Sequence, residues 1–168
     1  MRLHTFTFFC LAVLVSSSAS AQSPNPRPAP AAEFTAGYAG FADEGTIGHG
    51  VFGGAVRFHL TPRISVGPEV QFMVGPQSDR DLILTGNVTF DLLPRSSQVV
   101  PFFVVGGGLF THWDNFSGQS YASTEGAFTG GGGVRAWVSD RAYVAGEVRV
   151  GWELHYRLSG TVGIALGR

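Results

Sequence analysis

The feature that most constrains this chain is a hydrophobic pattern with a period of two. From Glu33 onward, apolar residues alternate with polar or small ones over successive segments, and no apolar stripe with helical spacing competes with this pattern. Residues 64–74 are a clear case, because Ile, Val, Pro, Val, Phe and Val alternate with Ser, Gly, Glu, Gln and Met. Since successive side chains of a strand point to opposite faces, the pattern predicts strands with one apolar and one polar face.

Turn residues divide the chain into eight such strands. Short connections contain Pro, Asp, Ser and Arg, as at Thr61-Pro62-Arg63. We expect longer connections at the opposite ends of the strands, chiefly at residues 111–125. Pro68 falls within a strand and cannot donate to a ladder, so it predicts a β-bulge. The predicted strands cover residues 33–42, 50–60, 64–74, 82–92, 99–110, 126–138, 142–152 and 157–167.

Eight strands joined in succession predict an all-β, antiparallel up-and-down barrel, but alternation alone does not say which face is wet. A soluble barrel has its polar face outside, whereas a transmembrane barrel has its polar face inside. The polar face here is mostly Gly, Ala, Ser and Thr, and only 14% of all residues are charged, against about 25% in an ordinary soluble domain. Strands of about ten residues also suit a tilted crossing of a bilayer. We therefore predict an eight-stranded transmembrane β-barrel.

The N-terminal segment has the pattern of a secretory signal peptide. Arg2 precedes an apolar run from Phe6 to Val15, and Ala19-Ser20-Ala21 fits a cleavage site. The single Cys of the chain lies in this run, so the predicted mature domain contains no disulfide. The predicted boundaries are 1–21 for the signal peptide, 22–32 for a linker rich in Pro and Ala, and 33–168 for the barrel domain.

The polar face of the predicted strands carries a nearly balanced set of charges. A charge inside a narrow barrel is costly unless it has an opposite partner, so these Arg and acidic side chains are expected to pair. The 11 basic residues are all Arg, whose guanidinium group can donate two parallel hydrogen bonds to a carboxylate. We predict a lumen plugged by ion pairs of Arg57, Glu69, Asp91, Arg135, Glu147, Arg149, Glu153 and Arg157.

One end of the predicted barrel gathers residue types that bind divalent metals. No motif relates their spacing, and ordinary solvent-exposed loop positions account for them better than a metal does, so we predict no metal site. The residues concerned are His49, His112 and His155, with Asp43, Asp114 and Glu153 near them in sequence.

No pattern in the chain predicts catalysis or a cofactor. His155 and Ser159 share one face of the last strand, but four residues of strand separate them by roughly 13 Å, too far for a nucleophile and its base. The runs Gly106-Gly107-Gly108 and Gly130–Gly133 precede no helix, and the chain has no Lys to meet a phosphate. A net charge of -1 offers no basic surface for nucleic acid.

Several segments resemble the small eight-stranded outer-membrane β-barrels of Gram-negative-type bacteria, the OmpA/OmpX type. They are the signal peptide, Pro62–Val70, Pro101–Gly108 and the closing strands from Ala142 to Gly167. The resemblance implies a location in the bacterial outer membrane, contact with outer-membrane lipid, and insertion by the outer-membrane assembly machinery. We also expect a monomer.

The assembly machinery of this family reads a C-terminal strand with a Gly and alternating apolar residues, usually ending in an aromatic residue. Thr161, Gly163 and Leu166 match this pattern, whereas the final position is Arg168. The resemblance therefore implies insertion through this strand, with a final residue that departs from the family's pattern.

The predicted function is a structural or surface-interaction role, in which the barrel stabilises the envelope or presents residues 113–125 to the outside. Two alternatives stay open at this point. One is a narrow porin-like channel for ions or small solutes, which would conduct in planar bilayers. The other is a soluble periplasmic carrier resembling lipocalins, which would fractionate without detergent.

Overall fold

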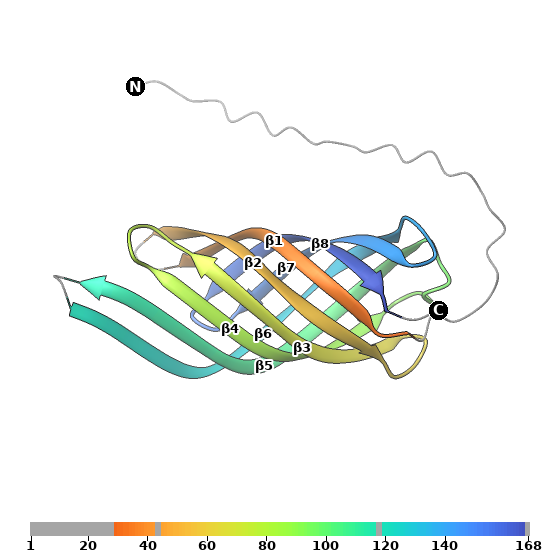
Figure 1. Ribbon diagram of the computed structural model, residues 1–168, viewed down its shortest axis with the longest axis horizontal. Coiled ribbons are helices and arrows are strands. Elements are labelled where there is room, and N and C mark those ends of the chain that lie inside the picture. Colours follow the sequence, from red (N-terminus) through yellow and green to blue (C-terminus); the bar gives the residue numbers. More distant parts are fainter. Residues whose placement is uncertain (1–28, 43–44, 117–118, 167–168) are drawn as a thin grey trace, which may run out of the picture.

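The computed structural model describes residues 29–42, 45–116 and 119–166. These residues form a closed barrel in which antiparallel strands follow one another in sequence order (Figure 1). The predicted signal peptide and most of the predicted linker lie outside the described residues, as do Asp43 and Arg168. The strands are β1 (Ala31–Ala42), β2 (Thr46–His59), β3 (Ile64–Val74), β4 (Arg80–Asp91), β5 (Val99–Phe116), β6 (Gln119–Trp137), β7 (Ala142–Gly151) and β8 (His155–Ala165).

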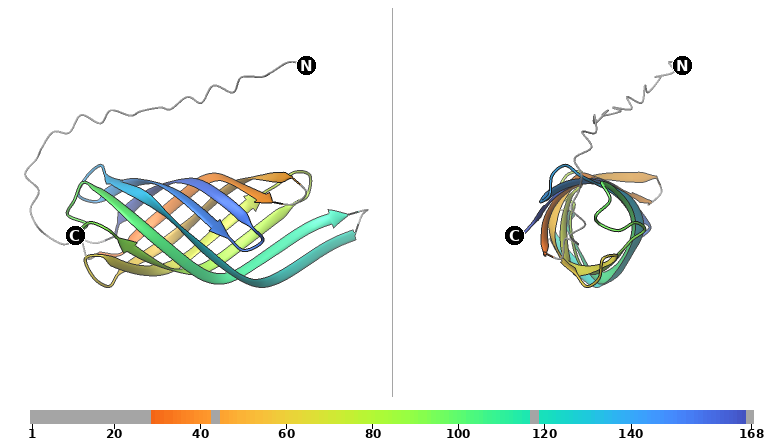
Figure 2. Two further views of the ribbon diagram at one scale, coloured as in Figure 1. Left: turned by 180° about the vertical axis from the view of Figure 1, so that it is seen from behind. Right: turned by 90° about the vertical axis from the view of Figure 1, so that its right-hand side faces the viewer.

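The barrel closes where the first strand meets the last. β1 pairs with β8 along its length, from Ala31 opposite Ala165 to Phe41 opposite His155, and the end-on view in Figure 2 shows the ring that results. Along the part of the barrel that all eight strands share, closure leaves no strand edge, so the backbone N–H and C=O groups can pair within the sheet, as an apolar surrounding requires. The predicted eight-stranded antiparallel up-and-down barrel is confirmed. The described residues contain no helix long and apolar enough to cross a membrane.

Side chains alternate between the lumen and the outer surface as the period of two predicts. On β4, Val88 is 47% exposed on the outside, whereas the adjacent Thr89 is fully buried in the lumen. All eight strands carry large exposed apolar side chains on the outer face, among them Phe34, Phe103 and Leu158. A continuous apolar outer surface of this kind is favourable in lipid and unfavourable in water.

The β5–β6 hairpin is longer than predicted and projects beyond the other strands (Figure 2). The prediction of a loop at residues 111–125 was wrong, because the ladder continues from Phe110 opposite Glu125 to Phe116 opposite Gln119. Thr111 and Thr124 also form a cross-strand hydrogen bond of 3.0 Å. The sequence pattern missed this extension because both faces of the hairpin are polar or mixed beyond the apolar outer belt.

Pro68 does not produce the predicted β-bulge. It lies opposite Gly86 in an unbroken register with β4, and the register between β2 and β3 is the same on both sides of it. The pairing of β2 and β3 is instead interrupted beside it, between Ala55–Glu69 and Phe58–Val66. The two strands approach closely there, because a Cβ atom on Gly67 would collide with the carbonyl oxygen of Val56. At the other boundary, β1 begins at Ala31, so the last two residues predicted for the linker belong to the first strand.

Candidate functional site

The barrel interior is packed in three layers. An apolar cluster lies at the end where β1 begins and β8 ends, and a larger apolar cluster lies at the opposite end. Charged and polar side chains fill the middle, where the strands cross the apolar belt. The first cluster contains Ala31, Val100, Trp137 and Tyr143, and the second contains Ala39, Phe41, Val51, Met73, Ile83 and Phe110.

The middle layer contains a bidentate ion pair between β1 and β2. Arg57 Nε donates to Glu33 Oε1 at 2.8 Å and Arg57 Nη2 donates to Glu33 Oε2 at 2.6 Å. The third guanidinium nitrogen donates to Thr89 Oγ1, and the Tyr143 hydroxyl donates to Glu33. Both charges are therefore neutralised and hydrogen-bonded, which is the condition under which buried charges are tolerated.

A second network joins strands from opposite sides of the lumen. Glu69 on β3 accepts from Arg149 Nη2 at 2.8 Å and from Arg157 Nη2 at 2.9 Å. Glu147 accepts from the same two guanidinium groups, at 2.5 Å from Arg149 Nε and at 3.3 Å from Arg157 Nη2. Asn87 Nδ2 also donates to Glu69 at 3.1 Å. Two cations and two carboxylates thus form a closed square across the barrel.

A third group lies toward the end with the smaller apolar cluster. Asp91 accepts from Arg135 Nη1 at 3.2 Å and from Arg95 Nε at 2.9 Å. The Arg135 guanidinium also lies over the rings of Phe102 and Tyr143, at 5.1 and 5.0 Å from their centres. Arg95 comes from the turn between β4 and β5, and it donates to the carbonyl oxygen of Thr61 at 3.0 Å. This turn therefore folds over the barrel end and adds a fifth cation.

Little space remains among these groups. A cavity beside them, lined in part by Glu33, Glu69 and Arg149, has a volume of about 10 Å³. That volume is near the minimum for one water molecule.

Seven of the eight residues predicted for the lumen network face the lumen and take part in these contacts. Glu153 does not: it lies in the turn between β7 and β8, is exposed, and has a positive φ of 56°. Its position after β7 breaks the alternation that places Glu147 and Arg149 inside. Sequence reasoning missed Glu33, which the same alternation could have found, and Arg95, whose place depends on how the turn folds back.

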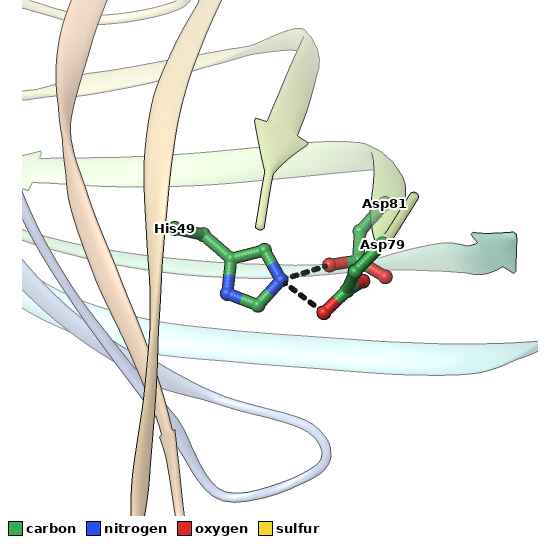
Figure 3. Close-up of side chains that lie close together, drawn as sticks. All are labelled: His49, Asp79 and Asp81. Atoms are coloured by element: carbon green, nitrogen blue, oxygen red, sulfur yellow. Dashed lines mark hydrogen bonds and ion pairs between the residues drawn. The ribbon is translucent and has the colours of Figure 1, made fainter. Parts of the chain in front are cut away.

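A cluster of His and Asp side chains lies at the other end of the barrel from the start of β1 and the end of β8 (Figure 3). His49 Nε2 lies 2.9 Å from Asp79 Oδ2 and 3.2 Å from Asp81 Oδ2. His112 Nδ1 lies 2.7 Å from Asp81 Oδ1. These groups come from β2, the β3–β4 turn, β4 and β5, so the cluster exists only because neighbouring strands pair. We call His49, Asp79, Asp81 and His112 the mouth cluster.

Two of the other residues considered for a metal have hydrogen-bond partners outside the mouth cluster. His155 Nδ1 is 2.6 Å from the carbonyl oxygen of Trp152. Asp114 accepts a hydrogen bond from the Ser78 hydroxyl at 2.8 Å and another from the Asn115 backbone N–H. Together these two bonds hold the pKa of Asp114 below its usual value. The expectation of no metal site is therefore reopened by Asp79 and Asp81, which sequence reasoning did not consider.

The fold has parallels among solved structures, although no family model and no curated protein matches the sequence. Neisserial surface protein A aligns with a TM-score of 0.73 and 11% identity, over 82% of this chain and 97% of that one. The N-terminal β-barrel domain of Pseudomonas aeruginosa OprF aligns with a TM-score of 0.63 and 12% identity, over 80% and 96%. This chain has the fold of the small outer-membrane β-barrels.

A third member of this group of structures is Ail, the attachment invasion locus protein of Yersinia pestis. It aligns with a TM-score of 0.52 and 13% identity, over 82% of this chain and 97% of that one. The likeness confirms the transmembrane barrel that the sequence predicted. Together with the apolar outer face, it agrees with the predicted location, the bacterial outer membrane.

Proposed function

We propose that this protein is an outer-membrane barrel with a structural or surface-interaction role, no catalytic activity, and a lumen plugged by ion pairs. The observation that carries the proposal is the filled middle layer. In the described part of the chain this layer sets five guanidinium groups, those of Arg57, Arg95, Arg135, Arg149 and Arg157, against four carboxylates, those of Glu33, Glu69, Asp91 and Glu147.

The plug argues against the porin-like channel. A solute passing through the lumen would have to separate pairs such as Glu69 and Arg157, whose side chains are 6% and 1% exposed. Separating a buried pair leaves two uncompensated charges and costs several kcal/mol. Among the described residues, charged and polar side chains fill the middle of the lumen, whereas a lipocalin-like carrier needs an apolar ligand cavity there.

The orientation that we propose puts the β5–β6 hairpin outside the cell. Small outer-membrane barrels keep short turns on the periplasmic side. Here the short turns at residues 60–63 and 138–141 lie at the same end as the start of β1 and the end of β8, and we assign this end to the periplasm. Insertion would then proceed through β8. Outer-membrane lipid would surround the belt, and the barrel would act as a monomer.

The projecting hairpin is the surface that we propose for interaction. It exposes Trp113 and Tyr121 beside hydroxyl side chains, and it carries Asp114 and Glu125 but no Arg. Ail has been solved in complex with the heparin analogue sucrose octasulfate. A polyanion of that kind does not suit the acidic hairpin here, so we propose an uncharged or cationic surface ligand for this chain.

Two measurements test the proposed function. A folded membrane barrel shifts its gel mobility on boiling, so an unshifted band from the membrane fraction would overturn the barrel. In planar bilayers, we expect no single-channel steps from the purified protein. If wild type gives regular single-channel steps, and substitution of Glu69 or Arg149 abolishes them, the lumen is a channel and the proposed plug is wrong.

A further inference from the structure

The mouth cluster has more carboxylate oxygen acceptors than imidazole N–H donors. His49 Nε2 faces two carboxylate oxygens, one from Asp79 and one from Asp81, at 2.9 and 3.2 Å. A single N–H can point at only one of them. The other Asp79 oxygen, Oδ1, lies 3.6 Å from His112 Nδ1, which is too long for a hydrogen bond, and it is buried without a hydrogen-bond partner among the described residues.

The three facing atoms are spaced as ligands of one small ion. The His49 nitrogen and one oxygen from each of Asp79 and Asp81 all lie within 4.8 Å of one another. In tetrahedral Zn²⁺ sites the Zn–N and Zn–O distances of about 2.0–2.2 Å place neighbouring ligands about 3.3–3.5 Å apart. The separations of 2.9 and 3.2 Å from the His49 nitrogen therefore need only a small expansion to admit the ion.

Gly75 leaves space at this point. A Cβ atom on Gly75 would collide with His49 Nε2 and would lie 2.7 Å from Asp79 Oδ2. The same turn is closed by a hydrogen bond of 3.0 Å from the Gly75 N–H to the Asp79 carbonyl oxygen, so the residue that keeps the space open also places Asp79. The gap thus borders one ligand atom from β2 and one from the β3–β4 turn.

The surroundings hold the ligands in a suitable arrangement. His112 Nδ1 contacts Asp81 Oδ1 and leaves Oδ2 directed at His49. His49 Nδ1 lies 3.4 Å from the carbonyl oxygen of Ile47, so the tautomer that carries its proton on Nδ1 can donate to that oxygen and leaves the Nε2 lone pair for a metal ion. The Phe41 ring packs edge-on against His49 at 4.8 Å between centres and belongs to the larger apolar cluster.

We propose that His49, Asp79 and Asp81 form a binding site for a divalent transition-metal ion at the mouth of the barrel, with Zn²⁺ as the ion of best fit. One imidazole and two carboxylates suit a borderline cation better than they suit Ca²⁺, which takes six to eight oxygen ligands. His112 is a positioning residue that orients Asp81. The fourth position would hold water, because Asp79 is 20% exposed and His112 is 34% exposed at this end.

The test uses the protein purified in detergent without a polyhistidine tag, titrated with Zn²⁺ in a calorimeter and with Co²⁺ in a spectrophotometer. We expect one Zn²⁺ per chain and an intense Co²⁺ absorption typical of four-coordination. His49→Gln and Asp79→Asn should weaken binding at least tenfold, and His112→Gln should weaken it by about 10- to 100-fold. Gly75→Ala should weaken it by filling the space beside Nε2.

The matched control is His155→Gln. His155 is buried at the same end and contacts the same Phe41 ring, but its Nδ1 lies against the Trp152 carbonyl oxygen, and no carboxylate of the described residues is bonded to it. This variant should keep wild-type affinity, and heat-dependent gel mobility should show that every variant is folded. The proposal is overturned if wild type binds no Zn²⁺, if His155→Gln loses as much affinity as His49→Gln, or if Ca²⁺ binds as tightly as Zn²⁺. An imidazolium at His49, paired with both carboxylates and indifferent to metal, would then explain the cluster.

Discussion

Glu69 provides the sharpest test of the ion-pair plug. Its two carboxylate oxygens accept from Arg149 and Arg157, at 2.8 and 2.9 Å, and all three side chains are nearly inaccessible to solvent. Glu69→Gln keeps the size of the side chain but removes its charge. The five cations of the middle layer would then face three carboxylates instead of four, and an amide N–H₂ group would point at a guanidinium donor.

The expected loss can be worked from these contacts. Breaking a buried ion pair by removing one partner costs about 3–5 kcal/mol of unfolding free energy. Glu147 still accepts from both Arg149 and Arg157, at 2.5 and 3.3 Å, so compensation is partial and the loss should fall at the lower end, about 3 kcal/mol. Adding Arg157→Met removes the cation that Glu69 leaves behind, and the double variant should recover at least about 1 kcal/mol.

The assay is urea unfolding in detergent micelles, followed by Trp fluorescence and by heat-dependent gel mobility. Glu153→Gln is the matched control, because it makes the same chemical change at an exposed position and should alter the unfolding free energy by no more than about 0.5 kcal/mol. A loss for Glu69→Gln as small as that of the control would refute the reasoning. So would a double variant that is simply the sum of its parts, because the two sites would then be uncoupled.

Two further predictions concern strand contact and pH. Gly67→Ala should destabilise the barrel by about 1–3 kcal/mol, because its Cβ meets the Val56 carbonyl oxygen, whereas Gly86→Ala, with open space at its Cβ, should be nearly neutral in the same urea assay; equal effects would contradict the close approach of β2 and β3. Partial desolvation and the neighbouring Glu125 raise the pKa of Glu153 in the exposed turn, so the folded state binds its proton more readily than the unfolded state does. The thermal stability of wild type relative to Glu153→Gln should therefore rise as pH falls from 7 toward the ordinary Glu pKa of about 4.3, and a flat difference would show that the two carboxyl groups do not interact.

The limits of prediction follow from particular residues. Alternation around Glu69, Asp91 and Arg149 predicted correctly which side chains face the lumen, because the period of two is a local property of any strand. It failed at Glu153, where a turn ends the alternation, and it overlooked the β5–β6 extension, where neither face is consistently apolar. It also could not find Arg95, since a turn residue has no periodic phase.

The sequence by itself determined the strands, the apolar outer face and the near balance of Arg and acidic residues in the lumen. Only the tertiary structure decided which Arg side chain pairs with which carboxylate. Glu69 and Arg157 are 88 positions apart in the chain, and they meet because register and closure bring β3 and β8 across one narrow lumen. The mouth cluster has the same origin: His49, Asp79 and His112 share no motif, and only the pairing of successive strands places them together.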